Sequence, residues 1–458
     1  MRKNIYIICL VSFILVVFLI EFAKSMANAA GTISAGKDYS LYVNENGEVF
    51  AWGNNYSGKL GDGTTTDRIY PVKLDSLSDK NIEKVLASCN NSFAIDKDNN
   101  LWAWGENLLN YLMVGVGDSE IDDCCQEYSG PSYYNESYTP TIVEEVKNIY
   151  DITSSCYHTL IITNNDELAL YAWGEGFAGQ LGINDRNMSY LYKPYKVYNP
   201  QSRNDFTIID VSAGNSFSIA LRSDGDAFTW GDNKYGQLGV DLVPIQMPPN
   251  ELFLMPLRTL INNMINYTSE YSIIPLETDK AEEVEELQIV DISAGGDHAL
   301  TLMEDGSLWA WGRNDKGQLG RGNVSKYSNI PMRVEFPDNT TIVQISAGQD
   351  HSLALDSDGS LWAWGDNSYG QIGIPNLDRE YCTLPVKVKD LPKVKEISAG
   401  FFHNLVITED NRIYGWGSNY YGQLARYQFE TIIQAPTEIR LDEREQPSYI
   451  LPRLNSVE

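Results

Sequence analysis

Histidine is the side chain best suited to acid–base chemistry near neutral pH, so the histidines are the first candidates for catalysis. The 458-residue chain has four of them, at His158, His298, His351 and His403. All four occupy the same place in a repeated sequence pattern, and Tyr39, Asn91 and Phe217 stand there in the other copies. Because this place accepts phenylalanine, we predict that the histidines pack or form hydrogen bonds inside the fold.

The carboxylates give no stronger candidate for chemistry. Asp356–Gly359 and Asp96–Asn99 look like the start of calcium-binding loops, but they lack the further oxygen ligands and the final glutamate of such a loop. The sequence contains no glycine-rich phosphate-binding loop, no His-Glu-x-x-His and no Gly-x-Ser-x-Gly motif. We therefore predict a protein that is not an enzyme, with no catalytic residues, no metal site and no cofactor.

Cysteine chemistry is limited to disulfide formation. Beyond Cys9 near the N-terminus, the cysteines are Cys89, Cys124, Cys125, Cys156 and Cys382. Their spacing is not that of metal ligands, and their odd number leaves at least one thiol free or paired between chains. Disulfides among the first four would fit an oxidising compartment, and the sequence leaves their connectivity open.

The elements that position these residues follow from an internal repeat. Its clearest copy contains Ile-Ser-Ala-Gly at 345–348, His-Ser-Leu-Ala-Leu at 351–355, Asp-Gly at 358–359, Leu-Trp-Ala-Trp-Gly at 361–365 and Gly-Gln-Ile-Gly at 370–373. The three apolar stretches predict short strands, and Asp-Gly predicts the hairpin turn between the second and the third. A Pro-x-x-Val segment, as at 385–388, predicts a fourth strand at the edge of the unit.

Seven copies of this repeat are present, each marked by a Trp-Gly pair. The tryptophans of these pairs are Trp52, Trp104, Trp173, Trp230, Trp311, Trp364 and Trp416. They lie 52, 69, 57, 81, 53 and 52 residues apart, so copies two, three and four carry insertions. All ten tryptophans fall in the third strand, where we expect them to fill the core. Units of three or four strands cannot bury their faces alone, so the pattern predicts an all-β, seven-bladed propeller.

The compound motif Ala-Gly-x-x-His-Ser-Leu, Asp-Gly, Trp-Gly-x-Asn and Gly-Gln-Leu-Gly, as it stands at residues 294–320 and 347–373, resembles the repeat of the regulator of chromosome condensation family. The resemblance extends from Ile33 to about Ile439 and implies a seven-bladed β-propeller. The second copy departs from the motif, because it lacks Gly-Gln-Leu-Gly and has Asn91 where histidine is usual.

The composition excludes some classes of partner. Lys and Arg total 34 against 62 Asp and Glu, a formal net charge of −28, so the surface repels phosphate backbones and anionic membranes. We therefore predict no nucleic-acid partner. The 36 glycines and 28 tyrosines are typical of a protein with many short strands and tight turns, and unlike a helical bundle.

The N-terminus resembles a secretory signal peptide. Met1-Arg2-Lys3 is followed by an apolar run from Ile5 to Ile20 and by Ala27-Asn28-Ala29, with cleavage expected after Ala29. An uncleaved membrane anchor is the alternative, because the apolar run is almost long enough to cross a bilayer. We expect a secreted or cell-surface monomer that contacts the membrane only if the signal is retained. The predicted division of the chain is signal peptide 1–29, propeller 30–440 with insertions 106–139 and 240–290, and C-terminal tail 441–458.

Two insertions and one set of rim residues are the candidate partner-binding elements. The first insertion is acidic and aromatic and includes Tyr133 and Tyr134. The second has an amphipathic stripe after Pro256 that predicts a short helix, which either packs on its own propeller or helps to bind a partner. An aromatic residue beside the glycine bend recurs at Tyr56, Phe177, Tyr235, Tyr369 and Tyr421. These five would share one rim, where they either contact a partner or pack against the neighbouring blade.

These features predict an exported, non-enzymatic module that binds a protein partner through one propeller face and its loops. Secreted propellers of this repeat type include a bacterial inhibitor that covers the active site of β-lactamases, so the resemblance implies that inhibiting an extracellular enzyme is one form of such binding. The founding member of the family implies the alternative, guanine-nucleotide exchange on a small GTPase. A cell-wall glycan binder is a third hypothesis, because exposed tyrosines can stack on sugars.

Overall fold

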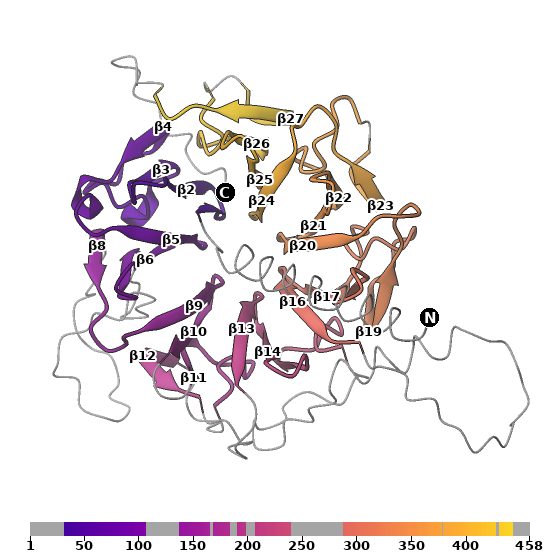
Figure 1. Ribbon diagram of the computed structural model, residues 1–458, viewed down its shortest axis with the longest axis horizontal. Helices are drawn as coiled ribbons and strands as arrows, with labels where there is room; N and C mark the ends of the chain where they lie inside the picture. Colours follow the sequence, from indigo (N-terminus) through magenta and orange to yellow (C-terminus); the bar gives the residue numbers. More distant parts are fainter. Residues whose placement is uncertain are drawn as a thin grey trace, which may run out of the picture.

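A computed structural model describes residues 32–106, 137–164, 168–183, 190–197, 207–239, 287–377, 379–426 and 430–442. These residues form seven antiparallel sheets that follow one another around a central axis in chain order, from indigo to yellow in Figure 1. The predicted all-β, seven-bladed propeller is therefore confirmed. None of the helices in the described ranges is long and apolar enough to span a membrane.

Blades 1 to 3 are four-stranded sheets built from consecutive strands. Blade 1 consists of β1 (Ile33–Ala35), β2 (Tyr39–Val43), β3 (Val49–Gly53) and β4 (Arg68–Lys73), with the short 3-10 helices η1 (Tyr56–Gly58) and η2 (Asp75–Leu77). Blade 2 consists of β5 (Ile82–Ala87), β6 (Asn91–Asp96), β7 (Leu101–Gly105) and β8 (Ser137–Ile142). Blade 3 consists of β9 (Ile149–Ser154), β10 (His158–Asn164), β11 (Leu168–Glu175) and β12 (Tyr190–Lys196).

Blade 4 has three strands within the described residues, and blades 5 to 7 have four each. Blade 4 consists of β13 (Ile208–Ala213), β14 (Phe217–Arg222) and β15 (Ala227–Gly231). Blade 5 consists of β16 (Ile289–Ala294), β17 (His298–Met303), β18 (Leu308–Arg313) and β19 (Tyr327–Val334). Blade 6 consists of β20 (Ile342–Ala347), β21 (His351–Asp356), β22 (Leu361–Asp366) and β23 (Tyr381–Lys387). Blade 7 consists of β24 (Val394–Ala399), β25 (His403–Thr408), β26 (Ile413–Ser418) and β27 (Ile432–Ile439).

Two glycines of blade 6 show why the repeat needs this residue at fixed places. Gly359, in the turn between β21 and β22, has a φ of +79°, which a side chain would strain. Gly365 follows Trp364 with a φ of +97°, and a Cβ there would lie 2.6 Å from the carbonyl oxygen of Asp350. The Trp-Gly pair therefore combines a large core side chain with a close approach of two backbone segments.

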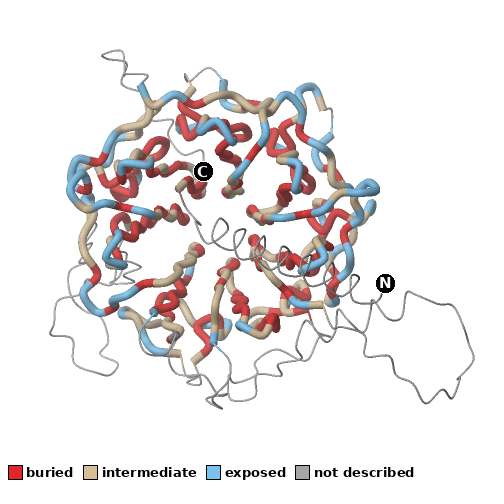
Figure 2. Tube along the Cα trace, viewed as in Figure 1, coloured by how far each residue is buried: buried red, intermediate tan, exposed pale blue. Residues whose placement is uncertain are grey.

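The hydrophobic core lies between neighbouring blades. Each buried cluster combines residues of adjacent sheets, as where Tyr39 and Leu41 of blade 1 pack with Val85 and Trp104 of blade 2. Buried residues extend from the inner strands through the middle of each blade in Figure 2, whereas exposed residues lie on the outer strands and turns. Six of the seven Trp-Gly tryptophans are fully buried, and Trp230 is partly buried.

The ring closes where blade 7 packs on blade 1. Every described sheet consists of strands that are consecutive in sequence, so no described strand from one end of the chain joins the sheet of the other end. Side chains make the connection instead: Ala35 N donates to Ser398 Oγ at 2.9 Å, and Trp52 Nε1 donates to the carbonyl oxygen of Gln423 at 2.8 Å. Five of the other six junctions use contacts of the same kinds among the described residues.

Several sequence predictions fall outside the described residues. These are the signal peptide 1–29, the helix after Pro256, most of both insertions, all but the first two residues of the tail 441–458, and Cys124, Cys125, Tyr133 and Tyr134. Of the remaining cysteines, Cys89 and Cys156 form a disulfide and Cys382 is free and buried. The disulfide settles one pairing that the sequence left open.

Candidate functional site

The four histidines lie inside the junctions between blades. Each is fully buried as the first residue of a second strand, and its Nε2 forms a hydrogen bond with the next blade. The pairs are His158 with Ser218 Oγ at 2.7 Å, His298 with Ser352 Oγ at 2.9 Å, His351 with Asn404 Oδ1 at 2.6 Å and His403 with Ser40 Oγ at 3.0 Å. Burial lowers the pKa of His158, His298 and His403 to about 3. These neutral, enclosed rings have no access to a substrate.

The tryptophans complete the same junctions. Trp364 Nε1 donates to the carbonyl oxygen of Gln318 at 2.8 Å, and Ser352 Oγ donates to the same oxygen at 3.0 Å. Gln318 belongs to the Gly-Gln-Leu-Gly turn of the preceding blade. The carbonyl oxygen of Gln318 thus accepts two hydrogen bonds from the next blade. Ser352, which donates one of them, also forms a hydrogen bond with His298. The repeated His, Ser, Trp and Gln form one network that connects blade to blade.

A cavity of about 530 Å³ lies on the propeller axis and is lined by the first strands of all seven blades. Its polar lining includes Lys84, Asp151, Asp210, Asp291, Gln344 and Glu396. Burial raises the pKa of Asp291 to about 7, and burial together with the charges of Asp151 and Asp291 raises the pKa of Asp210 well above its usual value. Burial in the cavity therefore favours the neutral form of these carboxyl groups.

These carboxyl groups bond the neighbouring blade and so have structural partners. Asp291 accepts a backbone hydrogen bond from Ile345 of blade 6, and Glu396 accepts one from Ile33 of blade 1 at 3.1 Å. Within the described ranges, no group of three or more His, Cys, Asp or Glu side chains is placed to hold a metal ion. The axial cavity is thus polar, and its carboxyl groups connect the first strands of neighbouring blades.

One face of the propeller carries two kinds of connection between strands, and we call it the loop face. The loop between first and second strands and the turn after the third strand meet there, as Asp366 N donates to the carbonyl oxygen of Asp350 at 2.8 Å. The five aromatic residues predicted to share a rim all precede the glycine of that turn, so they all lie on this face. Loops on a rigid scaffold are a common location for binding residues.

The five rim residues do not form one continuous surface. Tyr56 and Phe177 are strongly exposed, at 62% and 61%, and Phe177 packs edge-on against Tyr190 of its own blade. Tyr235 is partly covered, with the guanidinium of Arg313 lying 5.3 Å from its ring centre. Packing against the neighbouring blade, one of the two alternatives for the rim, therefore occurs at Tyr235, whereas Tyr56 and Phe177 are largely open to solvent.

Among the described residues, the largest aromatic cluster of the loop face joins blades 6 and 7. We call it the aromatic loop patch and define it as Tyr369, Phe401, Phe402, Tyr420 and Tyr421. The ring centres of Tyr369 and Phe402 are 5.0 Å apart, and those of Tyr369 and Tyr420 are 6.1 Å apart. Tyr420 and Tyr421 remain 53% and 44% exposed. The patch therefore combines fixed neighbouring rings with a large solvent-exposed area.

Sequence reasoning found Tyr369 and Tyr421 but missed the other three residues of the patch. Phe401 and Phe402 fill the variable pair between glycine and histidine, where blade 6 has Gln349 and Asp350. Two phenylalanines in a loop that is otherwise polar were a signal in the sequence. The contact between Tyr369 and Phe402 could not be predicted from the sequence, because it depends on how adjacent blades pack.

Family models match much of the chain. One model, described as the regulator of chromosome condensation (RCC1) repeat, matches residues 46–95, 169–221, 305–355 and 358–407. A second model with the same description matches residues 32–59, 208–237, 289–318, 342–371 and 394–423. The unmatched stretches include both insertions.

Three matches illustrate the similarity. The chain is 28% identical over 397 residues to the ultraviolet-B receptor UVR8 of Arabidopsis thaliana, covering 86% of this chain and 78% of the receptor. It is 24% identical over 459 residues to the guanine nucleotide exchange factor SRM1 of Saccharomyces cerevisiae, covering 91% and 88% of the two chains. The solved structure of Prp20p from Saccharomyces cerevisiae has the same fold, with a TM-score of 0.67 at 21% identity over 91% of this chain and 89% of that chain. Because the repeat models together match more than half of its residues and the seven blades are present, the chain belongs to the regulator of chromosome condensation (RCC1) repeat family.

Proposed function

We propose that the protein is an exported, non-enzymatic interaction module that binds a protein partner through the aromatic loop patch. The observation that carries this proposal is the exposure of Tyr420 and Tyr421 beside the packed rings of Tyr369 and Phe402. Tyrosine and phenylalanine are enriched at protein interfaces, because they bury a large area and lose little conformational freedom on binding. An exposed aromatic cluster of this kind is typical of an interaction site.

The charges around the patch indicate what the partner surface is like. Burial, and then the negative charges of Asp38 and Asp67 of blade 1, raise the pKa of the Tyr421 hydroxyl, so both carboxylates lie near the patch. The whole chain carries a net charge of −28. A partner with an apolar contact surface and basic residues at its edge would complement both features.

Export is supported by two independent features of the chain. Disulfides persist in oxidising compartments and are rare in the cytosol, and Cys89 and Cys156 form one here. The N-terminal sequence has the basic, apolar and small-residue regions of a signal peptide. We therefore propose that the protein works outside the cytoplasm, secreted or at the cell surface. As its partner we propose an extracellular enzyme, which is inhibited because the loop face covers its active site.

The proposal can be tested by capture of proteins from the surface and culture fluid of the producing cell. Oxidised residues 30–458 serve as bait beside a Tyr420→Ala/Tyr421→Ala variant, in which both substitutions are on exposed side chains. We expect the variant to bind the captured partner at least about tenfold more weakly, since central aromatic residues carry much of the energy of an interface. Assay of the captured enzyme with and without the bait then tests inhibition.

A matched control removes two exposed side chains from outer strand β23. Tyr381 and Leu384 are 38% and 50% exposed, and a Tyr381→Ala/Leu384→Ala variant should bind as the unmodified bait does. Equal loss in both double variants would contradict the assignment to the patch. Binding that is lost only when residues 245–288 are deleted would place the site on that insertion, and failure to capture any protein would favour the glycan hypothesis.

Guanine-nucleotide exchange is the second candidate, favoured by the match to SRM1 over 91% of the chain. Prp20p, whose fold this chain shares, has binding properties to Gsp1p and histones. Against this candidate stand the disulfide and the acidic net charge, which suit neither the cytosol nor contact with a nucleic acid. Faster release of labelled nucleotide from a small GTPase in the presence of the oxidised protein would establish exchange activity.

A further inference from the structure

A recurring hydrogen bond holds the inner strands of adjacent blades together. At six of the seven junctions, a hydroxyl oxygen of one first strand accepts a bond from a backbone N–H of the next first strand, at 2.8–3.1 Å. The six acceptors are Ser34, Thr153, Ser212, Ser293, Ser346 and Ser398. The junction between blades 2 and 3 is the exception, because Leu86 occupies that place and has no acceptor.

The same junction lacks two further links. Asn91 replaces the bridging histidine, and its Nδ2 donates to the carbonyl oxygen of Glu106 in its own blade at 2.9 Å. Trp173 Nε1 of blade 3 is buried with no hydrogen-bond partner among the described residues. Strand β9 also lies less close to β5 and β6 than the equivalent strands lie to each other at the other junctions. Within the described residues, the junction between blades 2 and 3 therefore lacks these three recurring links, and the hydrogen bond from Lys84 Nζ to the carbonyl oxygen of Tyr150 at 3.4 Å is one of the few that cross it.

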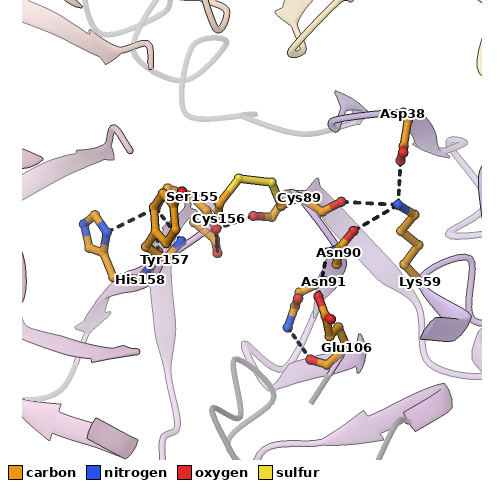
Figure 3. Close-up of a disulfide and its surroundings, with 12 residues drawn as sticks. Asp38, Lys59, Cys89, Asn90, Asn91, Glu106, Ser155, Cys156, Tyr157 and His158 are labelled. Carbon is orange, nitrogen blue, oxygen red and sulfur yellow. Dashed lines mark hydrogen bonds and ion pairs between the residues drawn. A yellow bond between two sulfur atoms is a disulfide. The ribbon is translucent and has the colours of Figure 1, made fainter. Parts of the chain in front are cut away.

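The disulfide crosses this junction. Cys89 lies in the loop between β5 and β6, Cys156 lies in the loop between β9 and β10, and their Cα atoms are 4.9 Å apart (Figure 3). Beside it, Ser88 Oγ donates to the carbonyl oxygen of Ser155 at 2.6 Å. The disulfide thus connects blades 2 and 3 at the junction that lacks the hydrogen-bonded network described above.

Buried Lys59 fixes the blade 2 side of the bond. Its Nζ contacts Asp38 at 2.5 Å, Asn90 Oδ1 at 3.1 Å and the carbonyl oxygen of Cys89 at 3.4 Å, as the dashed lines of Figure 3 show. The Cys89 loop is therefore tied to blade 1 by two hydrogen bonds from Lys59, whose ammonium group is held within blade 1 by the ion pair with Asp38. On the other side, Cys156 is partly exposed and its neighbour Tyr157 is 43% exposed, so a small thiol can approach the bond there.

We propose that the Cys89–Cys156 disulfide is a redox-controlled link that keeps the propeller ring closed between blades 2 and 3. A dithiol reductant is the co-reactant: one of its thiolates attacks a sulfur of the pair and forms a mixed disulfide, and its second thiol then displaces the remaining protein thiol. Two electrons and two protons pass to the protein, which gains two thiols, while the reductant becomes a disulfide. This junction then opens locally and the other six stay closed.

Hydrogen exchange followed by mass spectrometry tests this link on residues 30–458. The background variant Cys124→Ser/Cys125→Ser/Cys382→Ser leaves Cys89 and Cys156 as the only cysteines. Each sample is compared oxidised and after reduction by a dithiol under native conditions. We expect amides of β5, β6, β9 and β10 to exchange about tenfold or more faster after reduction, and those of blades 5 to 7 to be unchanged.

A rescue variant separates loss of the link from general destabilisation. In the Cys89→Ser/Cys156→Ser protein we expect the same fast exchange, and adding Leu86→Ser and Asn91→His supplies the side chains that other junctions use and should slow it again. Uniform acceleration in all blades, or no change on reduction, would overturn the proposal. If the serine variant fails to fold, reduction of the background protein alone still distinguishes these outcomes.

Discussion

At the residue scale, the repeat uses histidine as a buried neutral hydrogen-bonding group. Burial lowers the pKa of His158, His298 and His403 to about 3, well below the usual value of 6.5. The unfolded chain therefore takes up a proton on each of these histidines before the folded chain does. The stability that they contribute is fully present above about pH 6.5 and is lost as the pH falls toward 3.

This dependence of stability on pH gives a prediction for the His298→Gln variant. Between about pH 6 and 4, each such histidine should steepen the fall in the free energy of unfolding by about 1.4 kcal/mol per pH unit. Removing one of them should reduce that slope by the same amount, as measured by urea denaturation of the oxidised protein at several pH values. An unchanged slope would show that His298 titrates alike in both states.

The carboxyl groups of the axial cavity change the free energy of unfolding with pH in the opposite direction to the histidines. Burial raises the pKa of Asp291 to about 7, so the folded protein holds this proton where the unfolded chain has lost it. Its contribution is present at low pH and is lost as the pH rises through about 7. Comparison of the variant with the parent protein cancels this contribution, which is common to both.

At the element scale, a hydroxyl side chain links the first strands of neighbouring blades at six of the seven junctions. Ser293 Oγ of β16 accepts the bond from Ala347 N of β20 at 2.9 Å. Ser293→Ala should lower the free energy of unfolding by about 1–2 kcal/mol, because a partly buried N–H loses its partner. Urea denaturation measures this, with exposed Ser357→Ala in the turn of blade 6 as the control that should change it by less than about 0.5 kcal/mol. Equal effects would mean that the serine bond adds nothing to the junction.

The blades were predictable from sequence because their signals are local. Asp358-Gly359 places a hairpin turn and Leu361–Gly365 alternates large and small residues, so strands β21 and β22 follow from neighbouring residues alone. The site was only partly predictable. The ring contact of Tyr369 with Phe402 and the pairing of Cys89 with Cys156 join different blades, and such contacts depend on the angle at which blades pack.

At the scale of the whole molecule, the ring is closed by a junction like most of the others. His403 bonds Ser40, Trp52 bonds Gln423 and Ala35 bonds Ser398, which repeats the contacts between blades 5 and 6. In propellers whose last sheet takes a strand from each end, the sheet itself closes the ring. Here the described sheets each remain within one stretch of sequence, so closure depends on side chains and packing.

A circular permutant tests this view of closure. Residue 442 would be joined to residue 32 by a flexible linker about as long as the segment 388–393, which makes the equivalent connection from β23 to β24. The new ends would lie between exposed Asp338 and Asn339, in the connection from β19 to β20. Because the junctions on either side of that connection are unchanged and loop length has a small effect on stability, we expect the permutant to fold with a free energy of unfolding within about 1–2 kcal/mol of the parent. Failure to fold, or a larger loss measured by urea denaturation, would mean that the junction between blades 7 and 1 needs the native chain ends, and that the blades are not equivalent in closing the ring.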